Sequence, residues 1–158
     1  MFIRESRRTY ANRGVNGIDG STSTALGFSS VSESPTLLVT GDMSALYDIS
    51  ALYSGQLSSK FKMIIIANNG GEIFRMTKAT RDYENRENML CKMPEIKWDS
   101  VAQSVGMEYF EASDKESLRQ IISCFFEIRS QASMLVINTP AGNSRIYNDI
   151  IKEIHNKL

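Results

Sequence analysis

Two short groups of polar residues have the types and spacing to hold a metal ion together with a phosphate. The first is Gly41-Asp42-Met43, and the second is Asn68-Asn69-Gly70-Gly71-Glu72-Ile73-Phe74. Carboxylate and amide oxygens are the ligands that Mg2+ accepts when it keeps a phosphate as partner. A helix predicted over residues 44–53 starts beside Asp42, and its free N–H groups would attract the same anion.

The elements that must position these groups are two apolar stretches, residues 36–40 and 62–67, which we predict to be strands. A strand–helix–strand unit makes a right-handed crossover, so both strand ends lie at one edge of a parallel sheet. The second stretch is nearly continuous in Met and Ile, as expected for a strand covered on both faces. An ordinary crossover with turn residues at both strand ends is the alternative interpretation.

A glycine-rich segment upstream offers a third group. Gly14, Gly17 and Gly20 recur at every third position before a helix predicted over residues 21–30. Glycine lets the backbone approach a ligand closely. Arg13 carries a planar guanidinium, which suits a substrate carboxylate. The simpler alternative is a glycine-rich turn that leads into a helix.

In their order along the chain, the three groups resemble the thiamine-diphosphate enzymes, whose signature is Gly-Asp-x followed by Asn-Asn. Residues 12–25, residues 41–48 and the run Asn-Gly-Gly-x-Ile-Phe resemble one branch, the 2-succinyl-5-enolpyruvyl-6-hydroxy-3-cyclohexene-1-carboxylate synthases of menaquinone biosynthesis. The resemblance implies a transferase that uses thiamine diphosphate and Mg2+. It would decarboxylate 2-oxoglutarate and add the succinyl-semialdehyde unit to isochorismate.

The resemblance also implies roles for individual residues. Mg2+ would be bound by Asp42, Asn69 and the main-chain oxygen of Gly71, with Asn68 as the alternate for Asn69. The residues expected to contact the cofactor are Gly17, Ile18, Gly41, Asp42, Met43, Ser44, Ala45 and Asn69.

Four residues would act on the cofactor shape or the substrate. Ile18 would hold the cofactor in its bent shape, and Arg13 would bind a substrate carboxylate. Ile73 and Phe74 would line the pocket, with packing in the core as the alternative.

The rest of the chain alternates between predicted strands and helices. We expect a short strand at 9–11, a long charged loop with some helix at 75–95, a helix at 98–105 and a strand at 107–111. A capping box of Ser113 and Glu116 would start a helix that runs to 129. A strand at 133–138 and a helix from about residue 143 would follow. This alternation predicts an α/β fold, a doubly wound and mainly parallel sheet with helices on both faces.

The composition fits one cytoplasmic domain of 158 residues, with 42% hydrophobic and 23% charged residues. Eighteen basic and eighteen acidic side chains cancel, so the charge balance does not favour binding of nucleic acid or a membrane. The Arg-rich start is too polar for a signal peptide, and no apolar run is long enough for a membrane span. Cys91 and Cys124 are far apart and suggest incidental thiols.

The resemblance covers residues 1–158 but only the C-terminal, diphosphate-binding domain of the family protein. The pyrimidine-binding and central domains, and with them the acid–base glutamate, are absent from the chain. We therefore expect an isolated chain that is inactive, a pyrimidine-binding domain from the full-length protein or another subunit as partner, and a homo-oligomer. Two alternatives stay open. One is a decarboxylase or carboligase of the acetolactate-synthase type, and the other is a non-catalytic remnant that self-associates.

Overall fold

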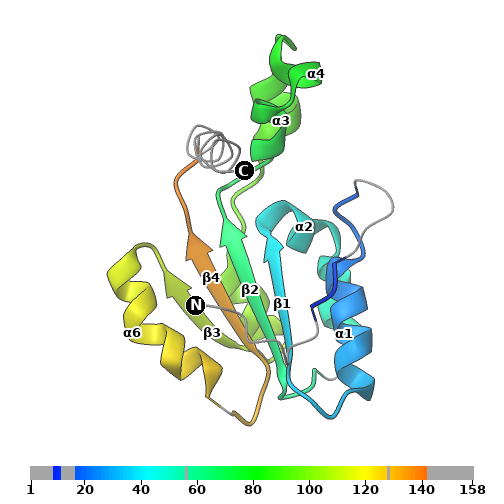
Figure 1. The fold of residues 1–158 in the computed structure, drawn as a ribbon, viewed down its shortest axis with the longest axis vertical. Coiled ribbons are helices and arrows are strands. Elements are labelled where there is room, and N and C mark those ends of the chain that lie inside the picture. The colour runs from blue at the N-terminus through cyan, green and yellow to red at the C-terminus, as the bar shows by residue number, and fades with distance from the viewer. Residues whose placement is uncertain (1–8, 12–16, 56, 128, 142–158) are drawn as a thin grey trace, which may run out of the picture.

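A four-stranded sheet forms the centre of the protein. The computed structural model describes residues 9–11, 17–55, 57–127 and 129–141. The strands are β1 (Thr36–Gly41), β2 (Phe61–Ala67), β3 (Glu108–Ala112) and β4 (Ser133–Asn138). They pair in the order β1-β2-β4-β3, and every pairing is parallel (Figure 1).

Six α-helices, one 3-10 helix and one π-helix are found within the described ranges. They are α1 (Ser21–Val31), α2 (Asp42–Tyr47), the 3-10 helix η1 (Ile49–Tyr53), α3 (Glu72–Met76), α4 (Lys78–Arg81), the π-helix η2 (Glu87–Cys91), α5 (Trp98–Ser104) and α6 (Lys115–Phe126). The segment with α3 and α4 projects beyond the carboxyl ends of the strands (Figure 1).

Alternate residues of β2 enter two separate hydrophobic clusters, one on each face of the sheet. Met63 and Ile65 belong to the larger cluster, which includes residues of α2, η1 and α5. Ile64 belongs to the smaller cluster, where Phe125 and its neighbours on α6 pack. A parallel strand buried on both faces is therefore the observed state, and the predicted doubly wound α/β fold is confirmed.

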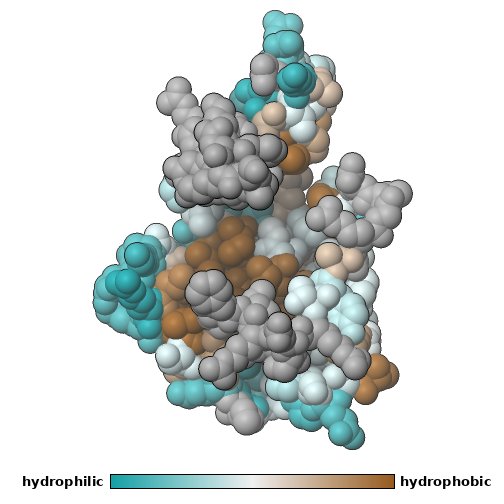
Figure 2. Space-filling model, in the orientation of Figure 1, coloured by the Kyte–Doolittle hydropathy of each residue, from teal (hydrophilic) through white to brown (hydrophobic). Residues whose placement is uncertain are grey.

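Strand β1 is an edge strand, and one of its faces is poorly covered by the described residues. Its side chains alternate between buried and exposed, and Leu37 and Val39 are 45% and 58% exposed. Figure 2 shows apolar surface on the viewed face of the sheet.

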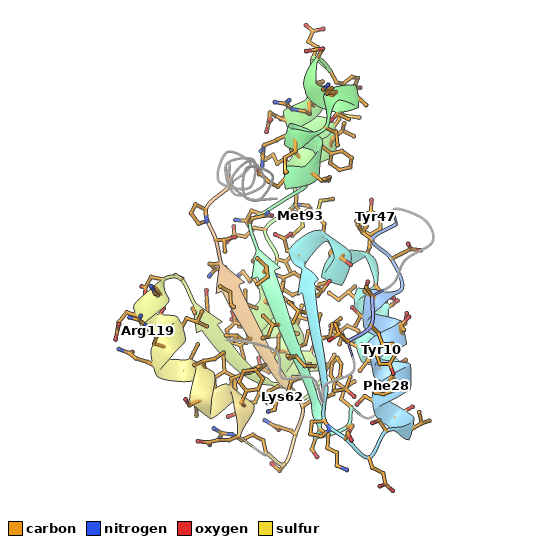
Figure 3. The ribbon with its side chains drawn as sticks, viewed as in Figure 1. Tyr10, Phe28, Tyr47, Lys62, Met93 and Arg119 are labelled. Carbon is orange, nitrogen blue, oxygen red and sulfur yellow. The ribbon has the colours of Figure 1, made fainter. Side chains whose placement is uncertain are left out.

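Lys62 on β2 links the sheet to helix α6. Its Nζ donates hydrogen bonds to the carbonyl oxygens of Phe125 and Glu127, at 2.7 and 2.9 Å, and so satisfies acceptors at the end of α6. Burial lowers the pKa of Lys62. The labelled side chain lies near the amino end of β2 in Figure 3.

Several boundaries differ from the sequence prediction. The predicted helix at 44–53 is two helices, α2 and η1, and α2 begins at Asp42 itself. The capping box lies one residue later than predicted, because Ser117 N–H donates to the carboxylate of Asp114 and the Ser117 hydroxyl accepts from Asp114 N–H. Residues 9–11 are irregular rather than a strand, and α6 ends at Phe126. The helix predicted from residue 143 lies outside the described residues. No helix within the described ranges has the length and hydropathy to cross a membrane.

Candidate functional site at the carboxyl edge of the sheet

The carboxylate of Asp42 joins the ends of β1 and β2. Asp42 is 2% exposed and begins α2 directly after β1. Its Oδ2 accepts hydrogen bonds from the backbone N–H groups of Asn68 and Asn69, at 2.9 and 2.7 Å. Its Oδ1 accepts from Met43 N–H at 2.8 Å. The prediction that the two polar groups meet at one edge of a parallel sheet is therefore confirmed.

The surroundings of this carboxylate suit a small cation. The described ion pairs involve arginines elsewhere in the chain, and none of them includes Asp42. Three neutral N–H donors offset part of the cost of burying the group, but they add no positive charge. No group of three or more His, Cys, Asp or Glu side chains in the described part of the chain could hold a metal. A metal here would therefore need amide and main-chain oxygens beside Asp42, which hard cations accept.

The two asparagines differ in what their side chains do. Asn68 Oδ1 accepts the N–H of Gly70 at 3.2 Å, which closes a turn. No hydrogen bond of the Asn69 side chain is found among the described residues, and this residue is exposed with φ 59°. Asn is one of the few residues that tolerate this left-handed conformation. The amide oxygen of Asn69 is therefore available to a ligand, whereas that of Asn68 already accepts one hydrogen bond, which fixes its direction.

The Gly70-Gly71 pair is required by a close backbone approach. Gly70 has φ 153°, and a Cβ there would lie 1.8 Å from the carbonyl oxygen of Cys91. A Cβ at Gly71 would lie 2.7 Å from the carbonyl oxygen of Leu90. Gly71 N–H donates to Cys91 O at 2.9 Å, and Gly70 forms a bridge with Lys92. The end of η2 therefore supports the loop that follows β2.

The described part of the glycine-rich segment lies against α2. Ser44 Oγ donates to the carbonyl oxygen of Ile18 at 2.5 Å. Asp48, directly after α2, accepts from the N–H and the hydroxyl of Ser23 in α1. The segment that carries Ile18 is thus fastened to the same helix that carries Asp42. Arg13 lies outside the described residues.

Most of the other predicted cofactor residues belong to α2 or directly precede it. Gly17 and Gly41 are exposed, Met43 and Ser44 are half-buried, and Ala45 is buried. All of them except Gly17 belong to the end of β1 or to α2.

The predicted pocket residues differ in exposure. Ile18 is 39% exposed and Ile73 is 57% exposed, so packing in the core is wrong for Ile73 in this chain. Phe74 is half-buried, and its Cδ2 lies 2.6 Å from the position of a Cβ at Gly71. Phe74 therefore packs on the loop, whereas Ile18 and Ile73 offer apolar surface at this edge.

The charged segment after the loop contains short helices joined by ion pairs. Arg75 on α3 pairs with Glu87 on η2 at 3.0 Å and with Glu72 at 2.5 Å. The hydrogen bond between Arg75 and Glu87 raises the pKa of Arg75 and lowers that of Glu87. The sequence predicted a long loop with some helix here. The pair of Arg75 and Glu72 has the i,i+3 spacing of a helix, whereas the pair of Arg75 and Glu87 follows no local pattern.

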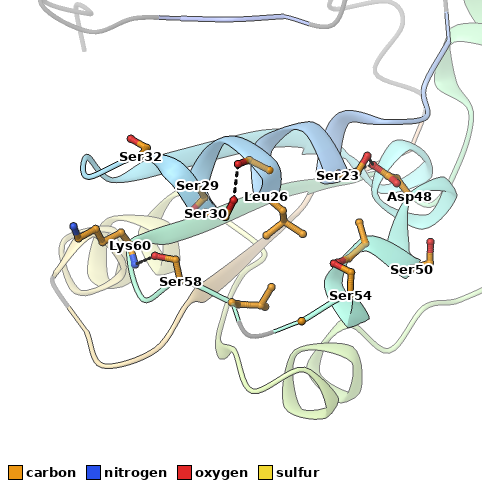
Figure 4. Close-up of a pocket in the computed structure, with 14 residues that line it drawn as sticks. Ser23, Leu26, Ser29, Ser30, Ser32, Asp48, Ser50, Ser54, Ser58 and Lys60 are labelled. Atoms are coloured by element: carbon orange, nitrogen blue, oxygen red, sulfur yellow. Dashed lines mark hydrogen bonds between the residues drawn. The ribbon is translucent and has the colours of Figure 1, made fainter.

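A separate open cavity of about 760 Å³ lies between α1 and η1. Its lining is rich in serine, with Ser23 and Asp48 on one side and Lys60 at the far end (Figure 4). It contains neither Asp42 nor Asn69, so it is distinct from the carboxyl-edge site.

Comparison with known proteins gives consistent matches. The chain is 34% identical over 152 residues to the 2-succinyl-5-enolpyruvyl-6-hydroxy-3-cyclohexene-1-carboxylate synthase of Christiangramia forsetii, which covers 96% of this chain and 26% of that protein. The synthase of the same name from Porphyromonas gingivalis is 36% identical over 131 residues, 83% of this chain and 23% of that protein. The one from Flavobacterium johnsoniae is 33% identical over 153 residues, 96% of this chain and 28% of that protein.

The chain thus spans about a quarter of the length of these curated relatives. No protein-family profile matches it. Among solved structures, a thiamine diphosphate-dependent 4-hydroxybenzoylformate decarboxylase of Rhodococcus jostii RHA1 aligns with a TM-score of 0.61 and 20% identity, over 74% of this chain and 22% of that one. This likeness shows that the fold is that of a thiamine diphosphate-dependent enzyme.

Proposed function

Over nearly its whole length this chain belongs to the family of 2-succinyl-5-enolpyruvyl-6-hydroxy-3-cyclohexene-1-carboxylate synthases, and we propose that it holds Mg2+ and the diphosphate of thiamine diphosphate in such an enzyme. The observation that carries the proposal is the buried carboxylate of Asp42, which binds the backbone N–H groups of Asn68 and Asn69. That contact brings a carboxylate and a free amide side chain together at the edge of a parallel sheet, where ligands of such sheets bind.

In this proposal each group at the edge has a defined task. Asp42 and Asn69 supply side-chain oxygens to Mg2+, and the main-chain oxygen of Gly71 is the third protein ligand. Gly71 O already accepts the N–H of Phe74 at 3.0 Å, but a carbonyl oxygen has a second lone pair for a metal. The Asn68 side chain is held in a turn by the N–H of Gly70, whereas no hydrogen bond of the Asn69 side chain is found among the described residues, and this difference supports Asn69 over Asn68 as the ligand. Residues 41–45 then lie next to the phosphates.

The apolar residues at the edge would act on the rest of the cofactor and on the substrate. Ile18 would support the ring part of the cofactor, and Ile73 and Phe74 would line the pocket. Arg13 would bind a substrate carboxylate. Thiamine diphosphate, when bound, supplies the carbanion chemistry, whereas the protein binds, orients and excludes water.

We further propose the substrates and the partner. The complete enzyme would decarboxylate 2-oxoglutarate and transfer the succinyl-semialdehyde unit to isochorismate in the cytoplasm. The chain would be inactive alone, because a pyrimidine-binding domain must supply the acid–base glutamate. That domain would come from the rest of the protein or from another subunit of a homo-oligomer.

A calorimetric titration tests the metal and diphosphate site. Thiamine diphosphate is titrated into the purified chain with Mg2+, then with a chelator, and the same series is run on Asp42→Ala and on Asp99→Ala. Asp99 is an exposed aspartate on α5, so its replacement is the matched control. We expect saturable binding that requires Mg2+, is lost in Asp42→Ala and is unchanged in Asp99→Ala.

The same titration is repeated with a pyrimidine-binding domain of a relative added in trans. Binding only in its presence would mean that the second domain orders the site, and the proposal stands. No binding in either arrangement, or equal binding by Asp42→Ala, would refute it. Formation of product from both substrates by the chain alone would refute the proposed inactivity.

A further inference from the structure

Helix α1 begins without a cap from its own sequence. Its N-cap residue, Gly20, has φ 74° and offers no side-chain hydrogen bond. Instead, the Oδ2 atom of Asp48 accepts the N–H of Ser23 at 2.7 Å and the Ser23 hydroxyl at 2.9 Å. Figure 4 shows the two side chains meeting at the start of α1. Asp48 therefore supplies, from a distant part of the sequence, the acceptor that a capping residue normally provides.

Helix α2 and the residue after it make hydrogen bonds to three segments at the carboxyl edge of the sheet. Asp42, its first residue, binds the loop after β2 through Asn68 and Asn69. Ser44 binds the carbonyl oxygen of Ile18. Asp48, the residue directly after α2, binds the start of α1. The segment from Ile18 to Ser23 is therefore held at both ends, by Ser44 at Ile18 and by Asp48 at Ser23.

We propose that Asp48 is a positioning residue that sets where Ile18 stands relative to the diphosphate site. The role rests on the proposed function, because Ile18 matters only if a ring-bearing diphosphate binds here. The side-chain hydrogen bonds of Asp48 found among the described residues go to Ser23, so Asp48 acts through α1 and the residues before it. Its carboxylate binds at the N-terminal end of α1, which favours negative charge.

This arrangement separates two parts of cofactor affinity. The diphosphate with Mg2+ depends on Asp42 and Asn69, whereas the described side-chain hydrogen bonds of Asp48 go to Ser23. The ring part depends on the position of Ile18. Loss of Asp48 should therefore weaken binding of thiamine diphosphate and leave binding of inorganic pyrophosphate unchanged. A merely structural role would weaken both ligands together.

The experiment compares the dissociation constants of Mg2+–thiamine diphosphate and Mg2+–pyrophosphate by calorimetry, with the pyrimidine-binding domain in trans if the parent chain needs it. The variants are Asp48→Ala, Asp48→Asn and the control Asp99→Ala. We expect Asp48→Ala to lose about five- to tenfold in affinity for thiamine diphosphate, the size of a lost cap, and less than about twofold for pyrophosphate. Asp48→Asn keeps an acceptor oxygen for Ser23 and should recover most of the loss.

A second set of variants tests whether Asp48 acts through Ile18. In an Ile18→Ala background, Asp48→Ala should have little further effect on thiamine diphosphate affinity, because the side chain being positioned is gone. Independent, additive losses would overturn the role. An equal loss for both ligands in Asp48→Ala, or no loss for either, would also overturn it.

The two proposals fail differently. If the parent chain binds neither ligand in any arrangement, the proposed function is refuted and the role of Asp48 falls with it. If the parent binds both ligands and Asp48→Ala keeps the parent's ratio of affinities, only the positioning role is refuted.

Discussion

Replacing Gly70 with alanine should disrupt the loop that follows β2. The added Cβ would lie 1.8 Å from the carbonyl oxygen of Cys91, a backbone atom that cannot rotate away. Gly70 has φ 153°, a backbone conformation that residues other than glycine rarely adopt. The loop and the end of η2 must therefore separate.

The loss of folding stability in Gly70→Ala has two contributions, the disfavoured backbone conformation and the separation of the loop from η2. A disfavoured backbone conformation costs about 1–3 kcal/mol. Separation also breaks the hydrogen bond from Gly71 N–H to Cys91 O, a net loss of about 1 kcal/mol. We expect Gly70→Ala to lower the free energy of unfolding by about 2–4 kcal/mol, a large share of the usual stability of a domain.

Gly27→Ala is the matched control, and it should change stability in the opposite direction. Gly27 lies within α1, and a Cβ there would meet no atom within 4 Å. Alanine in the interior of a helix is favoured over glycine by about 0.5–1 kcal/mol. Both variants can be unfolded with urea and followed by far-UV circular dichroism and by the fluorescence of Trp98, the single tryptophan, which is 6% exposed.

The two variants also differ in ligand binding. Gly70→Ala should weaken binding of Mg2+–pyrophosphate, because its loop carries Asn69, whereas Gly27→Ala should not. A Gly70→Ala protein with the stability of the parent would show that the contact with Cys91 is not tight, and the reasoning on this loop would be wrong.

Two further predictions concern the α6 layer. Phe125 is fully buried against Phe110 and Phe126. Phe125→Ala should therefore lower the free energy of unfolding, measured by urea denaturation, by about 3–5 kcal/mol. A loss under about 1 kcal/mol would contradict this packing. Asp114 caps α6, and the hydrogen bond from the Ser117 backbone lowers the pKa of Asp114 below its usual value. The ionised carboxylate therefore stabilises the fold above the usual pKa of an aspartate, and this stabilisation is lost as the pH falls through the lowered pKa. Asp114→Ala should therefore be less stable than the parent at pH 7, with a difference that shrinks in acid; a difference independent of pH would contradict the cap.

The sequence was informative wherever a local pattern determines the structure. The apolar runs of β2 and β4 were recognised because buried parallel strands are continuously hydrophobic, and β1 was recognised from a shorter apolar run although one of its faces is exposed. The meeting of Asp42 with residues 68 and 69 followed from the handedness of the crossover. In both cases a general rule connects neighbouring residues to a position in the sheet.

The missed features depend on contacts between distant residues. Asp48 and Ser23, and Gly70 and Cys91, meet only in the folded chain, and neither pair belongs to a repeating pattern. The cap of α6 was misplaced by one residue because Ser113 and Asp114 are both good capping residues, and only the backbone shows that Asp114 has the extended conformation of an N-cap.

The order of the strands has a consequence for synthesis on the ribosome. In the described sheet β4 lies between β2 and β3, although it is the last strand to be made. Strands β1 and β2 can pair once residue 67 has emerged, but β3 has no neighbour until Ser133–Asn138 follows. Until then the nascent chain holds half a sheet, with one edge of β2 and both edges of β3 unpaired, a state in which chaperones bind and in which partly folded chains associate. A translational pause before β4 should therefore lower the yield of folded protein more than a pause after it.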